Sequence, residues 1–197
     1  MLEILTGAGL AVSAGLNAYI PLLVLGLAGR FIDGVSLPGG WTWLSNEWVL
    51  GVIALLLVVE IIADKIPAVD SINDWLQSIV RPASGGIVFG GGALAETVAV
   101  SDPAAFVESG DWVPIAIGVG IALAVHLLKA LVRVAANTLS AGAAAPALST
   151  AEDITAVVLS LSALVLPLIV AVVLIALVVT VIVILRRARE RRRSVPA

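Results

Sequence analysis

The sequence predicts an all-α fold, a polytopic α-helical membrane bundle of about six hydrophobic segments, some of them interrupted or re-entrant where glycine and proline gather. Hydrophobic residues make up 60% of the 197-residue chain and charged residues 13%, and the mean hydropathy is +1.14. Soluble domains are roughly 45–50% apolar and 25% charged, so this composition excludes them. The lack of cysteine also excludes disulfide scaffolds and thiolate metal sites.

Six candidate spans follow from the apolar stretches, because about 20 helical residues cross a hydrocarbon layer of about 30 Å. The spans are 4–29, 46–65, 84–100, 112–133, 152–166 and 168–186. Pro167 lies near the middle of the longest uncharged stretch, where it either kinks one long span or marks a tight hairpin between two. The distribution of Lys and Arg favours the hairpin, since six spans place ten of the eleven on the cytoplasmic side and five spans place seven.

This topology makes residues 1–186 a single transmembrane domain that crosses the membrane several times, with both termini in the cytoplasm. Residues 187–197 form a basic cytoplasmic tail, which we interpret as a topology anchor near anionic lipid rather than a nucleic-acid site. Residues 70–81 place apolar side chains on one helical face and polar side chains on the other. They predict an amphipathic helix lying at the cytoplasmic interface.

Two of the predicted spans contain interruptions. In the first, Asn17 and Tyr19 fall near mid-membrane, beside the helix-breaking Pro21. In the third, residues 85–92 contain five glycines, which weaken a continuous helix. Broken helices with polar residues at the midplane are typical of many transporter sites. The alternative is that the glycines only allow close packing between helices.

Two stripes of ionisable residues lie at one depth in this topology. Glu60 and Asp64 are four residues apart on the second span, and His126, Lys129 and Arg133 follow one face of the fourth. An ionisable group at the bilayer centre costs about 2.5–3.5 kcal/mol, so we expect the acidic and basic stripes to pair. They form either an ion pathway or structural ion pairs between two helices, and direct contact between His126 and Glu60 would allow proton exchange.

The candidate site residues fall into two groups. Those expected to line a substrate or ion pathway are Glu60, Asp64, His126, Lys129, Asn17, Tyr19 and Glu96. Those expected in a structural polar network are Lys65, Asp70, Asn73, Asp74, Arg81, Arg133 and Glu152. A single histidine excludes a histidine-cluster metal site, whereas Glu60, Asp64 and Glu96 leave oxygen coordination of a hard cation open.

Four segments carry a family resemblance. They are Gly15-Leu-Asn-Ala-Tyr-Ile-Pro-Leu-Leu, Val59-Glu-Ile-Ile-Ala-Asp-Lys-Ile-Pro-Ala-Val-Asp-Ser-Ile-Asn-Asp, Val80-Arg-Pro-Ala-Ser-Gly-Gly and Leu148-Ser-Thr-Ala-Glu-Asp. With these segments the chain resembles a bacterial membrane family known as domain of unknown function 4126, over most of residues 5–190. The resemblance implies a location in the bacterial cytoplasmic (inner) membrane and a shared architecture, but no reaction. It draws attention to the polar residues Asn17, Glu60, Asp64, Lys65, Asp70, Asn73, Asp74, Arg81 and Glu152.

The function that these observations favour is a small transporter or channel for a cation or a proton-coupled small solute. The alternative is a non-catalytic membrane scaffold, an assembly partner or a lipid-interacting protein. Ser84 and His126 are the only suggestion of a catalytic dyad, and no catalytic motif accompanies them, so we expect no enzyme activity. The expected partners are the lipid bilayer, a small ion or solute and, if it oligomerises, a second copy of the chain. No cofactor and no nucleic acid are expected.

Overall fold

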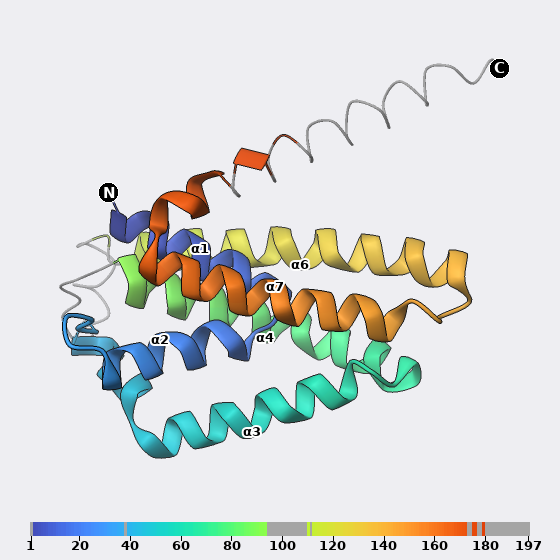
Figure 1. Cartoon of the computed structure of the whole chain (residues 1–197), viewed down its shortest axis with the longest axis horizontal. Helices are drawn as coiled ribbons and strands as arrows, with labels where there is room; N and C mark the ends of the chain where they lie inside the picture. The colour runs from blue at the N-terminus through green and yellow to red at the C-terminus, as the bar shows by residue number, and fades with distance from the viewer. Residues whose placement is uncertain are drawn as a thin grey trace.

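The computed structural model describes residues 2–37, 39–93, 110, 112–172, 175, 176 and 179, and all regular structure in these residues is helical. The chain is therefore all-α, as predicted. The main helices lie side by side along the long axis of the molecule (Figure 1). In chain order they are α1 (Leu2–Leu16), α2 (Tyr19–Phe31), the 3-10 helix η1 (Gly39–Ser45), α3 (Glu47–Ala63), α4 (Pro67–Ala93), α6 (Trp112–Ser140) and α7 (Ala145–Val165).

Two of these helices, α6 and α7, are long and apolar enough to cross a membrane. A third candidate span joins η1 and α3, which are bent by 64° where they meet, and α1 and α2 are shorter apolar helices. The described residues thus contain two or three candidate spans, which indicate a membrane protein. Of the six predicted spans, the fourth falls within α6, and the fifth falls within α7 except for its last residue, Leu166.

Residues 4–29, predicted as one interrupted span, instead form two helices that turn back on each other. Helix α1 ends at Leu16 and α2 begins at Tyr19, and α2 runs back toward the end of the bundle where α1 starts (Figure 1). Leu2 and Val35 accordingly line one cavity. We call this end, with residues 32–46, the Arg30 end, and the opposite end, with residues 64–66 and 141–144, the Lys65 end. The N-terminal residues and the loop after α2, expected on opposite faces, lie together because the α1–α2 pair turns back.

Helix α4 is continuous from Pro67 to Ala93, so the amphipathic segment 70–81 is its first half rather than a separate interfacial helix. The polar face of this segment points inward, because Gln77 and Arg81 are 2% and 0% exposed. The apolar face points outward, with Trp75 and Ile79 exposed. A helix surrounded by lipid gains nothing by burying its apolar face, whereas its polar groups must find partners inside the protein.

The glycine-rich part of α4 is helical rather than unwound, so the alternative reading as a packing seam holds. Gly85 of α4 and Gly118 of α6 bring the two backbones into contact, and a side chain on either would collide with the other helix. In the same way, Gly15 of α1 lies against the main-chain oxygen of Ala122 in α6. Small residues at these crossings let α1, α4 and α6 approach closely.

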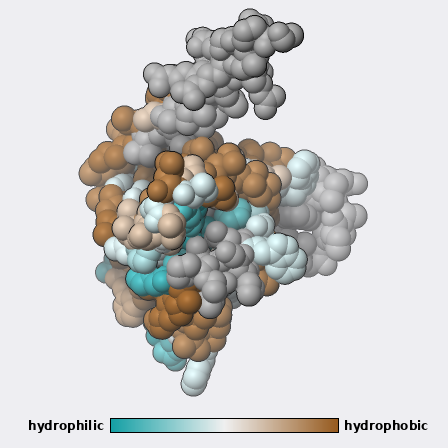
Figure 2. Space-filling model, turned by 90° about the vertical axis from the view of Figure 1, so that its right-hand side faces the viewer, coloured by the Kyte–Doolittle hydropathy of each residue, from teal (hydrophilic) through white to brown (hydrophobic). Residues whose placement is uncertain are grey.

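The outer surface of the bundle is apolar. The outward face of α3 exposes leucine, isoleucine and valine along most of its length, and only Leu50, Ile53 and Glu60 of this helix are buried. Seen from the Lys65 end, hydrophobic residues dominate the periphery and hydrophilic residues gather toward the middle (Figure 2). This distribution is the one expected when lipid surrounds the helices and charged groups are satisfied internally.

The chain bends sharply after α7. Helix α7 ends at Val165 and helix resumes at Pro167. A side chain on Gly9 would meet both Ala163 and Val170 within 3 Å, although a straight helix separates two residues seven positions apart by about 10 Å. Residues 187–197, predicted as a basic tail, and Glu96 lie outside the described residues.

Candidate functional site

Asn17 lies in the break between α1 and α2 and binds the first turn of α2. Its side-chain oxygen accepts hydrogen bonds from the main-chain N–H groups of Tyr19 (3.0 Å) and Ile20 (3.1 Å), as an N-cap residue does. Its amide nitrogen donates to a carboxylate oxygen of Asp153 in α7 at 2.9 Å. Ser84 of α4 donates to the main-chain oxygen of Ala18 at 2.5 Å. Protein groups from α4 and α7 thus bind the polar groups that the break exposes.

Lys129 of α6 binds the other side of the break. Its Nζ donates to the main-chain oxygen of Leu16, the last residue of α1, at 2.9 Å. The same atom lies 3.0 Å from Oε2 of Glu152 and 4.0 Å from Oδ2 of Asp64. A cation at the C-terminal end of a helix is favoured by the helix dipole. Lys129 therefore joins the broken helix to the carboxylates of α7 and of the turn after α3.

Arg133, one turn further along α6, extends this group of charges. Its Nε and Nη2 donate to the two carboxylate oxygens of Glu152 at 3.2 and 2.7 Å, a bidentate arrangement. Its Nη2 also lies 3.5 Å from Oδ2 of Asp64. The other oxygen of Asp64 accepts a hydrogen bond from Asn73 of α4 at 2.7 Å. Asp64, predicted beside the basic stripe, is therefore bound from both α4 and α6.

Arg81 of α4 lies between Glu60 and His126. Its Nη2 donates to Oε1 of Glu60 at 3.0 Å, and its Nη1 contacts Nδ1 of His126 at 3.2 Å. Arginine can only donate, so Nδ1 is the acceptor and the neutral ring carries its proton on Nε2, which lies 3.1 Å from the hydroxyl of Ser78. The expected direct contact of His126 with Glu60 is thus replaced by a bridge through Arg81, because α4 lies against α6.

Gln77 is a site residue that the sequence analysis did not select. It is buried on α4 between Asn73 and Arg81, and Tyr19 lies close to it and to Glu60 and Arg81. The signal was present, since residues 73, 77 and 81 are spaced by four and form one stripe. On an amphipathic helix at the membrane interface this stripe would face water, whereas here it faces the interior of the bundle.

Most of the predicted pathway and network residues thus meet in one place, which we call the charged cluster. Its members are Asn17, Tyr19, Glu60, Asp64, Asn73, Gln77, Arg81, His126, Lys129, Arg133, Glu152 and Asp153. Lys65 is exposed in the turn after α3, and the side chains of Asp70 and Asp74 are not among those described. Within the described residues, no three His, Cys, Asp or Glu side chains are grouped as a metal site requires.

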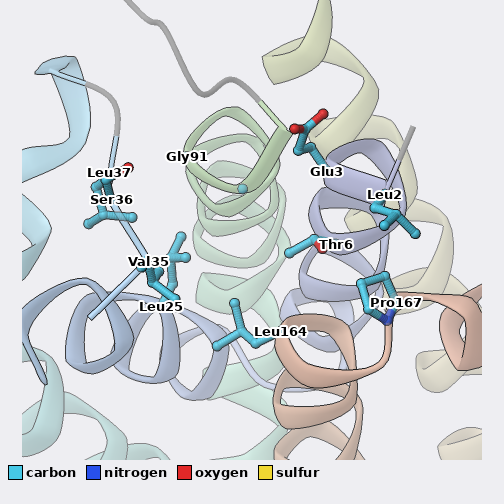
Figure 3. Close-up of a pocket in the computed structure, with 12 residues that line it drawn as sticks. Leu2, Glu3, Thr6, Leu25, Val35, Ser36, Leu37, Gly91, Leu164 and Pro167 are labelled. Carbon is cyan, nitrogen blue, oxygen red and sulfur yellow. The ribbon is translucent and has the colours of Figure 1, made fainter. Parts of the chain in front are cut away.

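Among the described residues lie two cavities of about 350 Å³ each, and of these the second is lined by residues of the cluster. One lies at the Arg30 end, between α1, α2, α4, α7 and the loop after α2, with Glu3 and Thr6 on its wall (Figure 3). Buried apolar residues, among them Leu10 and Val88, lie below it in the core. The second is a groove between α1, α6 and α7 with largely apolar walls, and Lys129 and Glu152 line it.

Comparison with known proteins supports the resemblance seen in the motifs. The model of a family described as a domain of unknown function, DUF4126, matches residues 4–187. No curated protein and no solved structure matches the chain significantly. The matched range contains the broken helix and all of the charged cluster, and it covers nearly the whole sequence. The chain therefore belongs to the DUF4126 family.

Proposed function

We propose that the protein is a small membrane transporter for a cation or a proton-coupled solute, with its pathway running past the break between α1 and α2. The observation that carries this proposal is the position of the break, which lies inside the bundle and is bound by Ser84 of α4, Lys129 of α6 and Asp153 of α7. Discontinuous helices of this kind expose main-chain groups and dipole ends that bind ions and small solutes in many transporters.

The charge balance of the cluster favours a positively charged cargo. Its described side chains include four carboxylates, those of Glu60, Asp64, Glu152 and Asp153, against three bases. The bases are Arg81, Lys129 and Arg133, since His126 is neutral by its hydrogen bonds. An uncompensated buried charge is costly. One further positive charge, a proton or a monovalent cation, would balance the charges of these described side chains.

The two cavities suggest how such a cargo would reach the cluster. The cavity at the Arg30 end leads toward the break, but the buried side chains of Leu10, Leu22 and Val88 separate the two. The groove along α6 and α7 already reaches Lys129. This arrangement is consistent with a transporter closed at the Arg30 end, in which a rearrangement of the apolar layer would expose the cluster to the other side.

The test is ion flux in liposomes that contain the purified protein and a pH-sensitive dye, with a pH gradient or a cation gradient imposed. We expect flux above that of empty liposomes, and Glu60→Gln should lower it by about tenfold or more, because the variant removes a buried carboxyl group that can bind and release a proton or a cation. The matched control is Glu47→Gln, the same chemical change at an exposed carboxylate that pairs with Arg30. Flux equal to that of empty liposomes, or unchanged in folded Glu60→Gln, would contradict the proposal.

The alternative is a non-catalytic scaffold, in which the charged cluster only holds the helices together. The dense pairing of the cluster favours it, because Asp64 and Glu152 each contact more than one base. A scaffold and a transporter differ in one result. Glu60→Gln that lowers stability in a protein with no flux supports the scaffold.

A further inference from the structure

Two buried acceptor atoms of the charged cluster have no hydrogen-bond partner. They are Oε2 of Glu60 and Oε1 of Gln77, and both side chains are almost completely buried, at 2% exposed. Buried polar atoms are hydrogen-bonded in the great majority of cases, so an unpartnered pair needs an explanation.

The register of α3 and α4 brings these two atoms to one level. The helices are joined by the short turn at residues 64–66 and run in opposite directions (Figure 1). Asn73 is hydrogen-bonded to Asp64 at 2.7 Å. One turn further from the loop along each helix come Gln77 and Glu60, which therefore lie at the next level on neighbouring helices.

Tyr19 of α2 lies beside the Gln77 amide. In the structure Oε1 of Gln77 has no partner and is available to accept a hydrogen bond. Two acceptor oxygens cannot bind each other unless one of them carries a proton.

We propose that Glu60 carries a proton on Oε2 and donates it in a hydrogen bond to Oε1 of Gln77, so that this pair is the proton-binding site of the protein. One proton then accounts for both unpartnered atoms. It also leaves three carboxylates against three bases in the described cluster. Arg81 keeps its bond to the other oxygen, Oε1 of Glu60. The inference deepens the proposed transport function by naming the coupling ion, but the protonation itself does not depend on transport.

Some of the groups around Glu60 favour its protonated form and others favour its ionised form. Arg81 from α4 and Lys129 from α6 favour the carboxylate, whereas burial and the nearby Asp64 favour the protonated acid. Tyr19 approaches from α2. Gln77 can serve both states, because rotation of its amide would present Nε2 as a donor once the proton leaves. A glutamine at this position therefore suits a carboxyl group that gains and loses a proton.

The test is infrared difference spectroscopy of the purified protein, which detects the C=O stretch of a protonated carboxyl group and its shift in D2O. We expect such a band at neutral pH, its loss in Glu60→Gln, and its retention in the exposed control Glu47→Gln. In Gln77→Leu the band should move to the higher frequency of a carboxylic acid that has lost its acceptor.

A wild-type protein without the band, or a band that persists in Glu60→Gln, would overturn the inference. Glu60→Gln should also fold, because its amide N–H2 can donate to Gln77 as the proton does, whereas Glu60→Leu leaves the acceptor unpartnered and should melt at a lower temperature. Equal melting of the two variants would count against the bond. The band without flux in liposomes would retain this site and reject transport, and flux without the band would do the reverse.

Discussion

Lys129 donates to the main-chain oxygen of Leu16 at 2.9 Å, so a side chain from the middle of α6 closes the end of α1. The four C-terminal carbonyls of a helix have no partner within it, and at a helix end in the interior of the bundle water cannot supply one. The ammonium group replaces the water. Its further contacts with Glu152 and Asp64 fix the position of the break relative to α7 and α3.

Lys129→Met should therefore destabilise the protein strongly. The change keeps the length of the side chain but leaves the buried carbonyl of Leu16 without its donor, which costs about 1–3 kcal/mol. It also removes one of the two bases that contact Glu152. The measurement is the free energy of unfolding in detergent. Lys65→Met is the control, since Lys65 is exposed, and it should change stability by less than about 0.5 kcal/mol. Equal losses in the two variants would contradict this role for Lys129.

A double-mutant cycle should separate the buried from the exposed ion pairs. Arg133→Gln and Glu152→Gln should each destabilise, and the double variant should lose less than the sum, with a coupling energy of about 1–3 kcal/mol. The same cycle on Arg30 and Glu47, whose side chains are 38% and 71% exposed, should give about 0–1 kcal/mol. Additive losses at the buried pair would show that it contributes no specific interaction.

The packing seam between α4 and α6 should be sensitive to a single methyl group. Gly118→Ala places Cβ against the backbone of Gly85 and should cost about 1–3 kcal/mol through overpacking. Gly120→Ala, two residues away on the same helix, meets nothing within 4 Å. It should stabilise by up to about 1 kcal/mol through helix propensity. Thermal unfolding of the two variants would test the seam, and equal shifts would refute it.

Asn17 and Asn46 allow the capping role to be separated from transport. Asn46 caps α3 by accepting a hydrogen bond from the N–H of Trp48, as Asn17 caps α2. Asn17→Ala and Asn46→Ala should each lose about 0.5–2 kcal/mol of stability. Only Asn17→Ala should lower flux in liposomes, because only Asn17 also binds Asp153 at the break. An equal effect of both variants on flux would reduce Asn17 to a structural residue.

The apolar layer below the cavity at the Arg30 end can be mapped with cysteines, because the chain has none of its own. A cysteine at Ser36, which lines the cavity, should react with a membrane-impermeant thiol reagent. One at Leu10 or Val88, both fully buried, should not react. Equal labelling at all three positions would show that the layer is open.

The sequence was sufficient for the fold class and for much of the site. Composition indicated a helical membrane protein, and the polar residues next to Pro21 predicted the interruption at Asn17. The spacing of Glu60, Asp64, Lys129 and Arg133 placed acids and bases in two facing stripes. Each of these predictions depends on local pattern and on the cost of burying charge, which are visible in a single sequence.

The incorrect predictions concern how the helices are oriented and which helices they contact, and local sequence pattern does not determine either. Periodicity shows that residues 70–81 have two faces, but not which face meets the protein, and in lipid the polar face turns inward. Arg81, Lys129 and Arg133 were counted as cytoplasmic charges, whereas all three are buried within helices. The return of α2 beside α1 depends on contacts from α4, α6 and α7, which are distant in sequence.

The close approach of Gly85 and Gly118 also determines where the molecule can move. Backbones in direct contact resist sliding, so α4 and α6 behave as one stiff body with α1 held against it. Helix α3 has few buried residues and few contacts with α4, yet it carries Glu60 at its inner face. A change of charge at Glu60 would therefore act on a helix that packs less extensively against the rest of the bundle than α4 and α6 do.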